Sequence, residues 1–150
     1  MTHSLRAHYF HLIWSTKNRA PLINVDIQYS LHAYLGGIIR NHKGKLLEAG
    51  GTLDHIHLLI GLNLPDKFSE LIRDVKANSS LWINKNFCKK EYFSWQEGYG
   101  SFSVSYSSLE KVHCYIKNQQ EHHKKITFEK EYMQLLKKHQ IQFDSRFVLG

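Results

Sequence analysis

The stretch Leu53-Asp54-His55-Ile56-His57-Leu58-Leu59-Ile60 decides how this chain can fold, because two histidines alternate in it with large apolar residues. In a β-strand, neighbouring side chains point to opposite faces, so His55 and His57 share one face. The apolar residues between and after them share the other face, which predicts a core strand. Imidazoles are costly to bury without partners, and paired neutral imidazoles are common metal ligands. The stretch therefore predicts either a metal-ligand pair or two half-exposed histidines on the wet face of a sheet.

A second pattern runs from Leu109 to Lys125, where apolar residues recur at the spacing of an α-helix. Two serines directly precede it and are typical of a helix N-cap. On such a helix Tyr115 and Gln119 lie one turn apart on the same face, with His122 near the same line. A hydroxyl and an amide beside a histidine pair can form a metal-assisted nucleophilic site. Alternatively, Tyr115 is a core aromatic residue and Gln119 a solvated polar one.

The remaining sequence predicts strands and helices that alternate around these two segments. The order strand, helix, strand, strand, helix, strand, helix is typical of an α+β fold with an antiparallel sheet. We expect a ferredoxin-like (RRM-like) sandwich with helices packed on one face of that sheet. Strands are expected over residues 4–17, 46–49, 53–62 and 102–106, and further helices over 25–42, 65–86 and 128–139.

Composition restricts the class of protein and its partners. The chain has 150 residues, is 42% hydrophobic and carries a formal net charge of +7, which suits one globular domain over residues 1–150. Such a charge favours a polyanionic partner, either nucleic acid or an acidic membrane surface. No apolar run reaches the roughly 18 residues that span a bilayer, and no signal peptide is visible. Cys88 and Cys114 fit reduced thiols, so we expect a cytoplasmic protein. If its polyanionic partner is DNA, the protein is nucleoid-associated when bound.

His55-Ile56-His57 and the segment Tyr115-Ile116-Lys117-Asn118-Gln119 together resemble the motifs of the HUH single-strand nucleases. Among these, the chain is most similar to the single-tyrosine transposases of small insertion sequences and to their repeat-associated tyrosine transposase relatives. The opening segment Tyr9–Arg19 resembles the family's first strand and basic loop, and Trp95–Gly100 the segment before its last strand. The resemblance covers nearly the whole chain in the same order, and it implies the same α+β fold with a catalytic tyrosine on a C-terminal helix.

The resemblance also implies a chemistry. Tyr115 would attack a phosphodiester of single-stranded DNA and leave a 5′-phosphotyrosine and a free 3′-hydroxyl, so that the strand can be rejoined without ATP. His55, His57 and Gln119 would hold a divalent metal. The family implies Mg²⁺ or Mn²⁺, whereas two imidazoles usually favour zinc, nickel or copper, so we expect Mn²⁺ to fit better than Mg²⁺. Residues that could support the ligands are Asp54 and His122.

The expected substrate is single-stranded DNA with hairpins at the ends of a mobile element. The family further implies a homodimer, in which the tyrosine helix of one protomer can complete the partner's histidine site. Basic residues expected to contact DNA are Lys17, Arg19, Arg73 and Lys76. Two alternatives stay open: a domesticated protein that binds hairpin DNA or RNA without strand transfer, and a metal-dependent hydrolase whose nucleophile is water.

Overall fold

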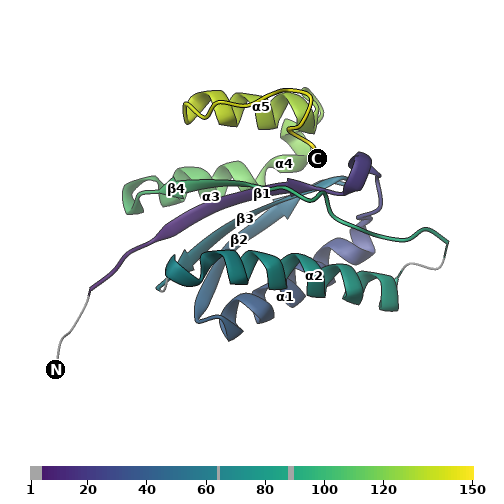
Figure 1. The fold of residues 1–150 in the computed structure, drawn as a ribbon, viewed down its shortest axis with the longest axis horizontal. Helices are drawn as coiled ribbons and strands as arrows, with labels where there is room; N and C mark the ends of the chain where they lie inside the picture. Colours follow the sequence, from purple (N-terminus) through teal and green to yellow (C-terminus); the bar gives the residue numbers. More distant parts are fainter. Residues whose placement is uncertain (1–4, 64, 88–89) are drawn as a thin grey trace.

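The computed structural model describes residues 5–63, 65–87 and 90–150, and it places a four-stranded antiparallel sheet between two layers of helices (Figure 1). The strand order is β2-β3-β1-β4. This order, with a helix after β1 and another after β3, is that of the ferredoxin-like sandwich, so the predicted α+β fold is confirmed. The elements are β1 (Tyr9–Ser15), α1 (Val25–Asn41), β2 (Gly44–Gly51), β3 (His55–Leu62), α2 (Phe68–Asn86), β4 (Gly100–Val104), α3 (Leu109–Lys117), α4 (Gln119–His122) and α5 (Phe128–Lys138).

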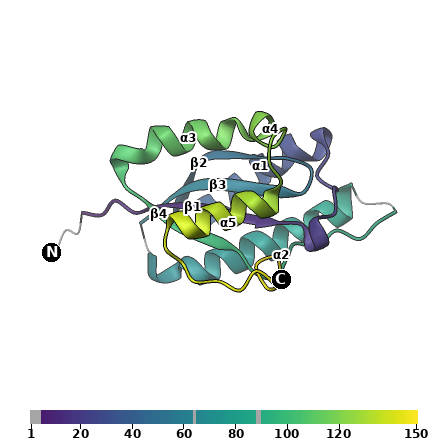
Figure 2. The same cartoon turned by 90° about the horizontal axis from the view of Figure 1, so that it is seen from above.

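Helices α1 and α2 cover one face of the sheet and bury its apolar side chains (Figures 1 and 2). The alternation of β3 places Ile56, Leu58 and Ile60 in this layer, each 1% exposed or less. From β1, Leu12 and Trp14 join them. The layer contains nearly all of the large buried aliphatic residues, and it provides the main hydrophobic stabilisation of the domain.

The opposite face is covered as well, by α3, α4 and α5, so the expectation that helices pack on one face only was wrong. Helix α3 runs along β2 and β3, whereas α5 lies over β1 and β4 (Figure 2). The reason is the apolar stripe of α5, in which Phe128, Tyr132 and Leu136 recur at helical spacing and pack on Ile13 and Phe102.

Two local predictions differ from the structure. The helix expected from Leu109 to Lys125 is divided at Asn118, whose φ and ψ of −96° and 20° end α3 before α4 begins. The amide of Asn118 still bonds to the carbonyl of Cys114, so Tyr115 and Gln119 stay on one face. Ser108 is the N-cap residue of α3, but its side chain makes no capping hydrogen bond.

Cys114 is an exposed free thiol, and Cys88 lies outside the described residues. Among the helices of the described part of the chain, none combines the length and the apolar character needed to cross a membrane.

Candidate functional site

Both histidines of β3 point into the layer between the sheet and the helices α3 to α5. His55 is 1% exposed and His57 is fully buried, so the alternative of half-exposed histidines on a wet face was wrong. His11 from the neighbouring strand β1 joins them, and its Nε2 lies 2.8 Å from Nδ1 of His57. Burial lowers the pKa of His57 to about 4 and that of His11 to about 3. The imidazoles are therefore held in the neutral form that metals bind.

The contacts of His55 favour a cation at Nε2 of its imidazole ring. Nδ1 lies 2.8 Å from the carboxylate of Asp54, which assigns the proton of a neutral ring to Nδ1. Nε2 then presents a lone pair to Oε1 of Gln119 at 2.9 Å. Exchanging the oxygen and nitrogen of the Gln119 amide would be costly, because the Nε2 of Gln119 donates a hydrogen bond to Glu131 at 3.0 Å. Two acceptors that face each other at this distance require a cation between them, either a metal or a proton.

Glu131, from α5, lies at the centre of the site and is 1% exposed. Its Oε1 lies 2.9 Å from Nε2 of His57 and 3.0 Å from Nε2 of His123. Burial alone would raise the pKa of this carboxyl, but the hydrogen bonds from His123, His57 and Tyr115 hold it well below its usual range. The pKa of His123 is raised in turn, since the bond to Glu131 and its negative charge outweigh the effect of burial.

Tyr115 reaches this centre from α3 of the same chain. Its hydroxyl donates to Oε2 of Glu131, and its ring centroid lies 5.7 Å from that of His57. Burial, with the adjacent carboxylate, raises the pKa of the phenol above its ordinary value. The structure thus brings Tyr115, Gln119 and the histidine pair together within one chain. Helical spacing predicted that Tyr115 and Gln119 share a face, whereas only the family resemblance joined this face to the histidine strand. Gln119 is 1% exposed, so the alternative of a solvated glutamine was wrong.

A glycine sets the distance between α3 and the sheet. Gly50 pairs with His57 in the ladder between β2 and β3. A Cβ atom on Gly50 would lie 2.2 Å from the carbonyl oxygen of Ile116, the residue after Tyr115. No side chain fits at position 50, and glycine therefore lets the tyrosine helix approach the histidine strand.

The donor set fits a divalent metal. His55, His57, His123 and Glu131 each offer one ligand atom, and the four atoms lie within 4.8 Å of one another. Nε2 of His122 is buried without a hydrogen-bond partner in the described residues. It lies 3.3 Å from Glu131 but without hydrogen-bond geometry. Nitrogen donors with one carboxylate suit manganese, zinc or a later transition metal better than magnesium.

Sequence reasoning missed three members of the site: His11, His123 and Glu131. The signal for Glu131 was present, since a carboxylate beside Phe128 and Tyr132 interrupts the apolar stripe of α5. A charged residue on an apolar helix face is rarely buried without partners. For His11 and His123, no periodicity in the sequence indicated the contacts, which arise only from packing.

The basic residues expected to contact DNA lie in different places. Lys17 and Arg19 lie in the 3-10 turn after β1, and Arg19 is 3.8 Å from Glu129 of α5. Arg73 and Lys76 belong to α2, on the other side of the sheet. The ammonium of Lys76 donates to the carbonyls of Gln96, Glu97 and Gly98 at 2.7–2.8 Å. Lys76 therefore holds the segment before β4, and the structure does not bring it or Arg73 to the histidines.

These features define an α+β sandwich with a buried histidine and glutamate cluster beside a tyrosine. The sequence model of the family "Transposase IS200 like" matches residues 4–119. The chain therefore belongs to the IS200-like transposase family, which confirms the resemblance inferred from its motifs.

Two solved structures share the fold. One is the crystal structure of a protein from Deinococcus radiodurans R1 assigned as a transposase, with a TM-score of 0.64, 22% identity, and coverage of 79% of this chain and 95% of that one. The other is a REP-associated tyrosine transposase bound to a REP hairpin, with a TM-score of 0.57, 15% identity, and coverage of 79% and 72%. A comparison with curated proteins gave no significant match.

Proposed function

We propose that this protein cuts and rejoins single-stranded DNA at hairpin-bearing ends, with Tyr115 as the nucleophile and a divalent metal at His55 and His57. The observation that carries the proposal is the convergence of the Tyr115 hydroxyl, the histidine pair and Gln119 on one carboxylate, Glu131. A nucleophile and a ligand set within hydrogen-bond reach of one group can act on one phosphate.

The chain's own groups account for the proposed chemistry. The oxygen of Tyr115 forms a bond to phosphorus, the bond from phosphorus to the 3′ oxygen breaks, and a 5′-phosphotyrosine results. Glu131 accepts the hydrogen bond of the phenol and orients it, and the phenol proton is transferred through solvent to the leaving 3′ oxygen, which becomes a hydroxyl. A bound metal would polarise the phosphate and offset the charge that develops on it. His122, whose Nε2 has no hydrogen-bond partner in the described part of the chain, would be available to donate to a phosphate oxygen that enters the site.

We propose His55, His57 and Gln119 as metal ligands, with Asp54 orienting His55 through its Nδ1. Glu131 and His123 complete the set of donors around them. We expect Mn²⁺ to support the reaction better than Mg²⁺, because the donors are rich in nitrogen.

We propose hairpin-bearing DNA as the substrate, because a tyrosine transposase of the same fold is bound to a REP hairpin and the chain carries a net charge of +7. A homodimer stays a prediction from the family. Because one chain supplies Tyr115 and both histidines to one site, we propose that strand cleavage uses the tyrosine helix of the same chain.

The test is a denaturing gel of the protein mixed with labelled single-stranded DNA from both sides of its own gene, with Mn²⁺ or Mg²⁺. We expect a covalent protein–DNA band that depends on metal and is lost in Tyr115→Phe and in His57→Ala. The matched control is Tyr132→Phe, which removes the hydroxyl of another buried tyrosine in the same layer and should leave the band unchanged.

A hairpin-binding protein without strand transfer is the second candidate. It is favoured by the position of α5, whose Glu131 takes up the hydrogen bond of Tyr115 and covers the histidines. A hairpin shift on native gels without any covalent band, in either metal, would establish this second function and remove the first. Metal-dependent cleavage that persists in Tyr115→Phe would indicate a hydrolase that uses water.

A further inference from the structure

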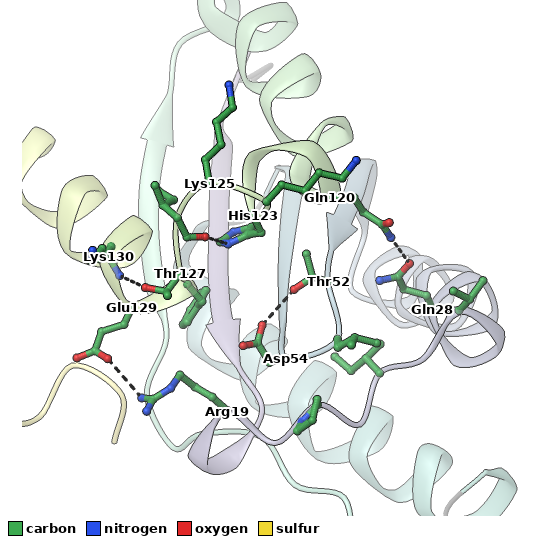
Figure 3. Close-up of a pocket in the computed structure, with 17 residues that line it drawn as sticks. Arg19, Gln28, Thr52, Asp54, Gln120, His123, Lys125, Thr127, Glu129 and Lys130 are labelled. Carbon is green, nitrogen blue, oxygen red and sulfur yellow. Dashed lines mark hydrogen bonds and ion pairs between the residues drawn. The ribbon is translucent and has the colours of Figure 1, made fainter.

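A pocket of about 920 Å³ opens beside the histidine cluster (Figure 3). Its walls come from the turn after β1, the start of α1, the turn between β2 and β3, and the connection from α4 to α5. The volume lies in the range of small-ligand sites, roughly 300–1,000 Å³, which is enough for an unpaired nucleotide but not for a duplex.

The pocket and the proposed metal site share residues. Asp54 lines the pocket and bonds to Nδ1 of His55 at 2.8 Å. His123 lines it too, and bonds to Glu131 at 3.0 Å. A strand whose phosphate lies at the histidines would therefore pass beside this pocket.

The charges at the pocket match a polyanion. Lys125 and Lys130 are exposed at the pocket, and within the described ranges neither forms an ion pair. Arg19 reaches across to Glu129, as Figure 3 shows, at a loose 3.8 Å. Flexible lysines around a recess suit the phosphates of a nucleic acid strand.

The inner surface offers both an apolar face and amide groups. Leu53 is 49% exposed and Val25 is 75% exposed, so each presents aliphatic surface on which the face of a base can lie. Gln28 and Gln120 come from α1 and α4, and their amides meet at a long 3.4 Å (Figure 3). The Nε2 of Gln28 also donates to the carbonyl of Gly51, again at a long 3.4 Å. Bonds this weak can be exchanged for hydrogen bonds to the edge of an unpaired base, which proteins read in this way.

We propose that this pocket binds the nucleotide of single-stranded DNA next to the cleaved phosphate, and that Gln28 and Gln120 read its base. The proposal rests on the proposed function for the position of that phosphate. The wall from Gln120 to Lys130 lies beyond the family match, which ends at residue 119. The C-terminal segment of this chain therefore contributes Gln120 to the base reading, while Gln28 lies within the family match.

The first test measures binding of fluorescent single-stranded dT12 to the Tyr115→Phe protein at several salt concentrations. We expect Lys125→Ala/Lys130→Ala to weaken binding about tenfold and to reduce the slope of log affinity against log salt by about 1.4, or about 0.7 per lost contact. The matched control is Lys45→Ala/Lys85→Ala, which removes the same charge from exposed residues of β2 and α2. An equal loss of dT12 affinity in both double variants, or no dT12 binding at all, would contradict the proposal that this pocket binds single-stranded DNA.

The second test selects bound strands from a pool with randomised bases around the cleavage site. We expect Gln28→Ala and Gln120→Ala to lose the preference at one position, from about tenfold to none, while preferences elsewhere stay. Unchanged base preferences would show that Gln28 and Gln120 do not read the base.

The outcomes separate the two proposals. A covalent band with equal dT12 binding in both lysine variants contradicts only the proposed role of the pocket. Selective loss of dT12 binding without any covalent band contradicts the nucleophile alone.

Discussion

On the α1–α2 side of the sheet, β3 contributes Ile56, Leu58 and Ile60 to an apolar core, whereas on the α3–α5 side the same strand contributes His55 and His57. The first layer is stabilised by the removal of apolar surface from water, which tolerates small shifts. The second layer contains imidazoles, an amide and a carboxylate that must all find partners, because unpaired polar groups are costly to bury.

The comparison indicates that the two faces of the sheet have different roles. The apolar layer fixes the strand, and the alternation of the strand then fixes where the histidines point. The polar layer provides chemistry but depends on contacts between α3, α5 and the sheet. Stability and activity should therefore respond to different substitutions.

The largest loss of stability should follow from Leu58→Ala. Leu58 is fully buried between the sheet and the helices, so the cavity should lower the free energy of unfolding by about 2–5 kcal/mol. Urea unfolding measures this, with the exposed Leu81→Ala of α2 as the control, expected within about 0.5 kcal/mol of the wild type. At 10 °C, where the variant stays folded, metal-dependent formation of the covalent band should persist. Its loss there would show that the two faces are not independent.

The converse substitution is Gly50→Ala, which should spare the apolar layer and damage the site. The new methyl group would meet the carbonyl of Ile116 at 2.2 Å, so α3 must move and carry Tyr115 away from His57. A displacement of about 1 Å can cost about 10²-fold in rate, or roughly 2.7 kcal/mol. Single-turnover kinetics of covalent band formation measures the loss.

Gly61→Ala in β3 is the matched control for this prediction, because its Cβ would meet the ring of Tyr9 at 3.5 Å and the carbonyl of His8 at 4.0 Å, both ordinary contacts. Hairpin binding should be equal in both variants. A Gly50→Ala protein with the wild-type rate would show that the close approach of α3 is not needed for the reaction.

Much of the fold could be predicted from local sequence patterns. The period of two in β3 predicted which face carries His55 and His57, and the period of 3.6 predicted that Tyr115 and Gln119 share a face. Both patterns are properties of one element and need no knowledge of its neighbours. The family resemblance then placed these two elements together.

The remainder depended on packing between elements that are distant in sequence. Glu131 reaches the site only because α5 docks on β1 and β4. The apolar stripe of α5 indicates that this helix packs on the domain, but not on which strands. The three carbonyl partners of Lys76 come from an irregular segment, which has no periodicity that would indicate the contact. The position of Lys76 on the polar side of a helix therefore predicts a solvated DNA contact instead. The break at Asn118 likewise had no glycine or proline to indicate it.

The role of α5 can be tested through Glu131→Gln, which keeps the shape of the side chain but removes its charge. Since Glu131 Oε1 contacts two imidazoles, we expect the affinity for Mn²⁺ to fall about tenfold or more. The readout is the rise in melting temperature on adding Mn²⁺, which follows from ligand binding to the folded state. The control Glu129→Gln, a half-exposed neighbour that pairs with Arg19, should keep the full rise. An equal rise in both variants would exclude Glu131 as a ligand.

The smallest expected effect is the dependence of the metal-free protein on pH, and it again separates the two faces. The pKa values of His57 and His11 fall from 6.5 to about 4 and about 3 in the folded chain, because burial disfavours the charged rings. Between pH 6.5 and 4 the unfolded chain therefore binds more protons, so stability decreases as the pH falls. The lowered pKa of Glu131 acts in the same direction below its ordinary value of 4.5, whereas the raised pKa of His123 partly offsets the loss.

We expect a net loss on the order of 1–2 kcal/mol between pH 7.5 and 5, measured by urea unfolding in EDTA. In His11→Gln, where one neutral buried ring is gone, the loss should be smaller. In the exposed His8→Gln it should equal that of the wild type. A wild-type protein as stable at pH 5 as at pH 7.5 would mean that the imidazoles of the polar layer take up protons without opening it. In that case hydrogen bonds to Glu131, rather than the neutrality of the rings, would hold the layer together.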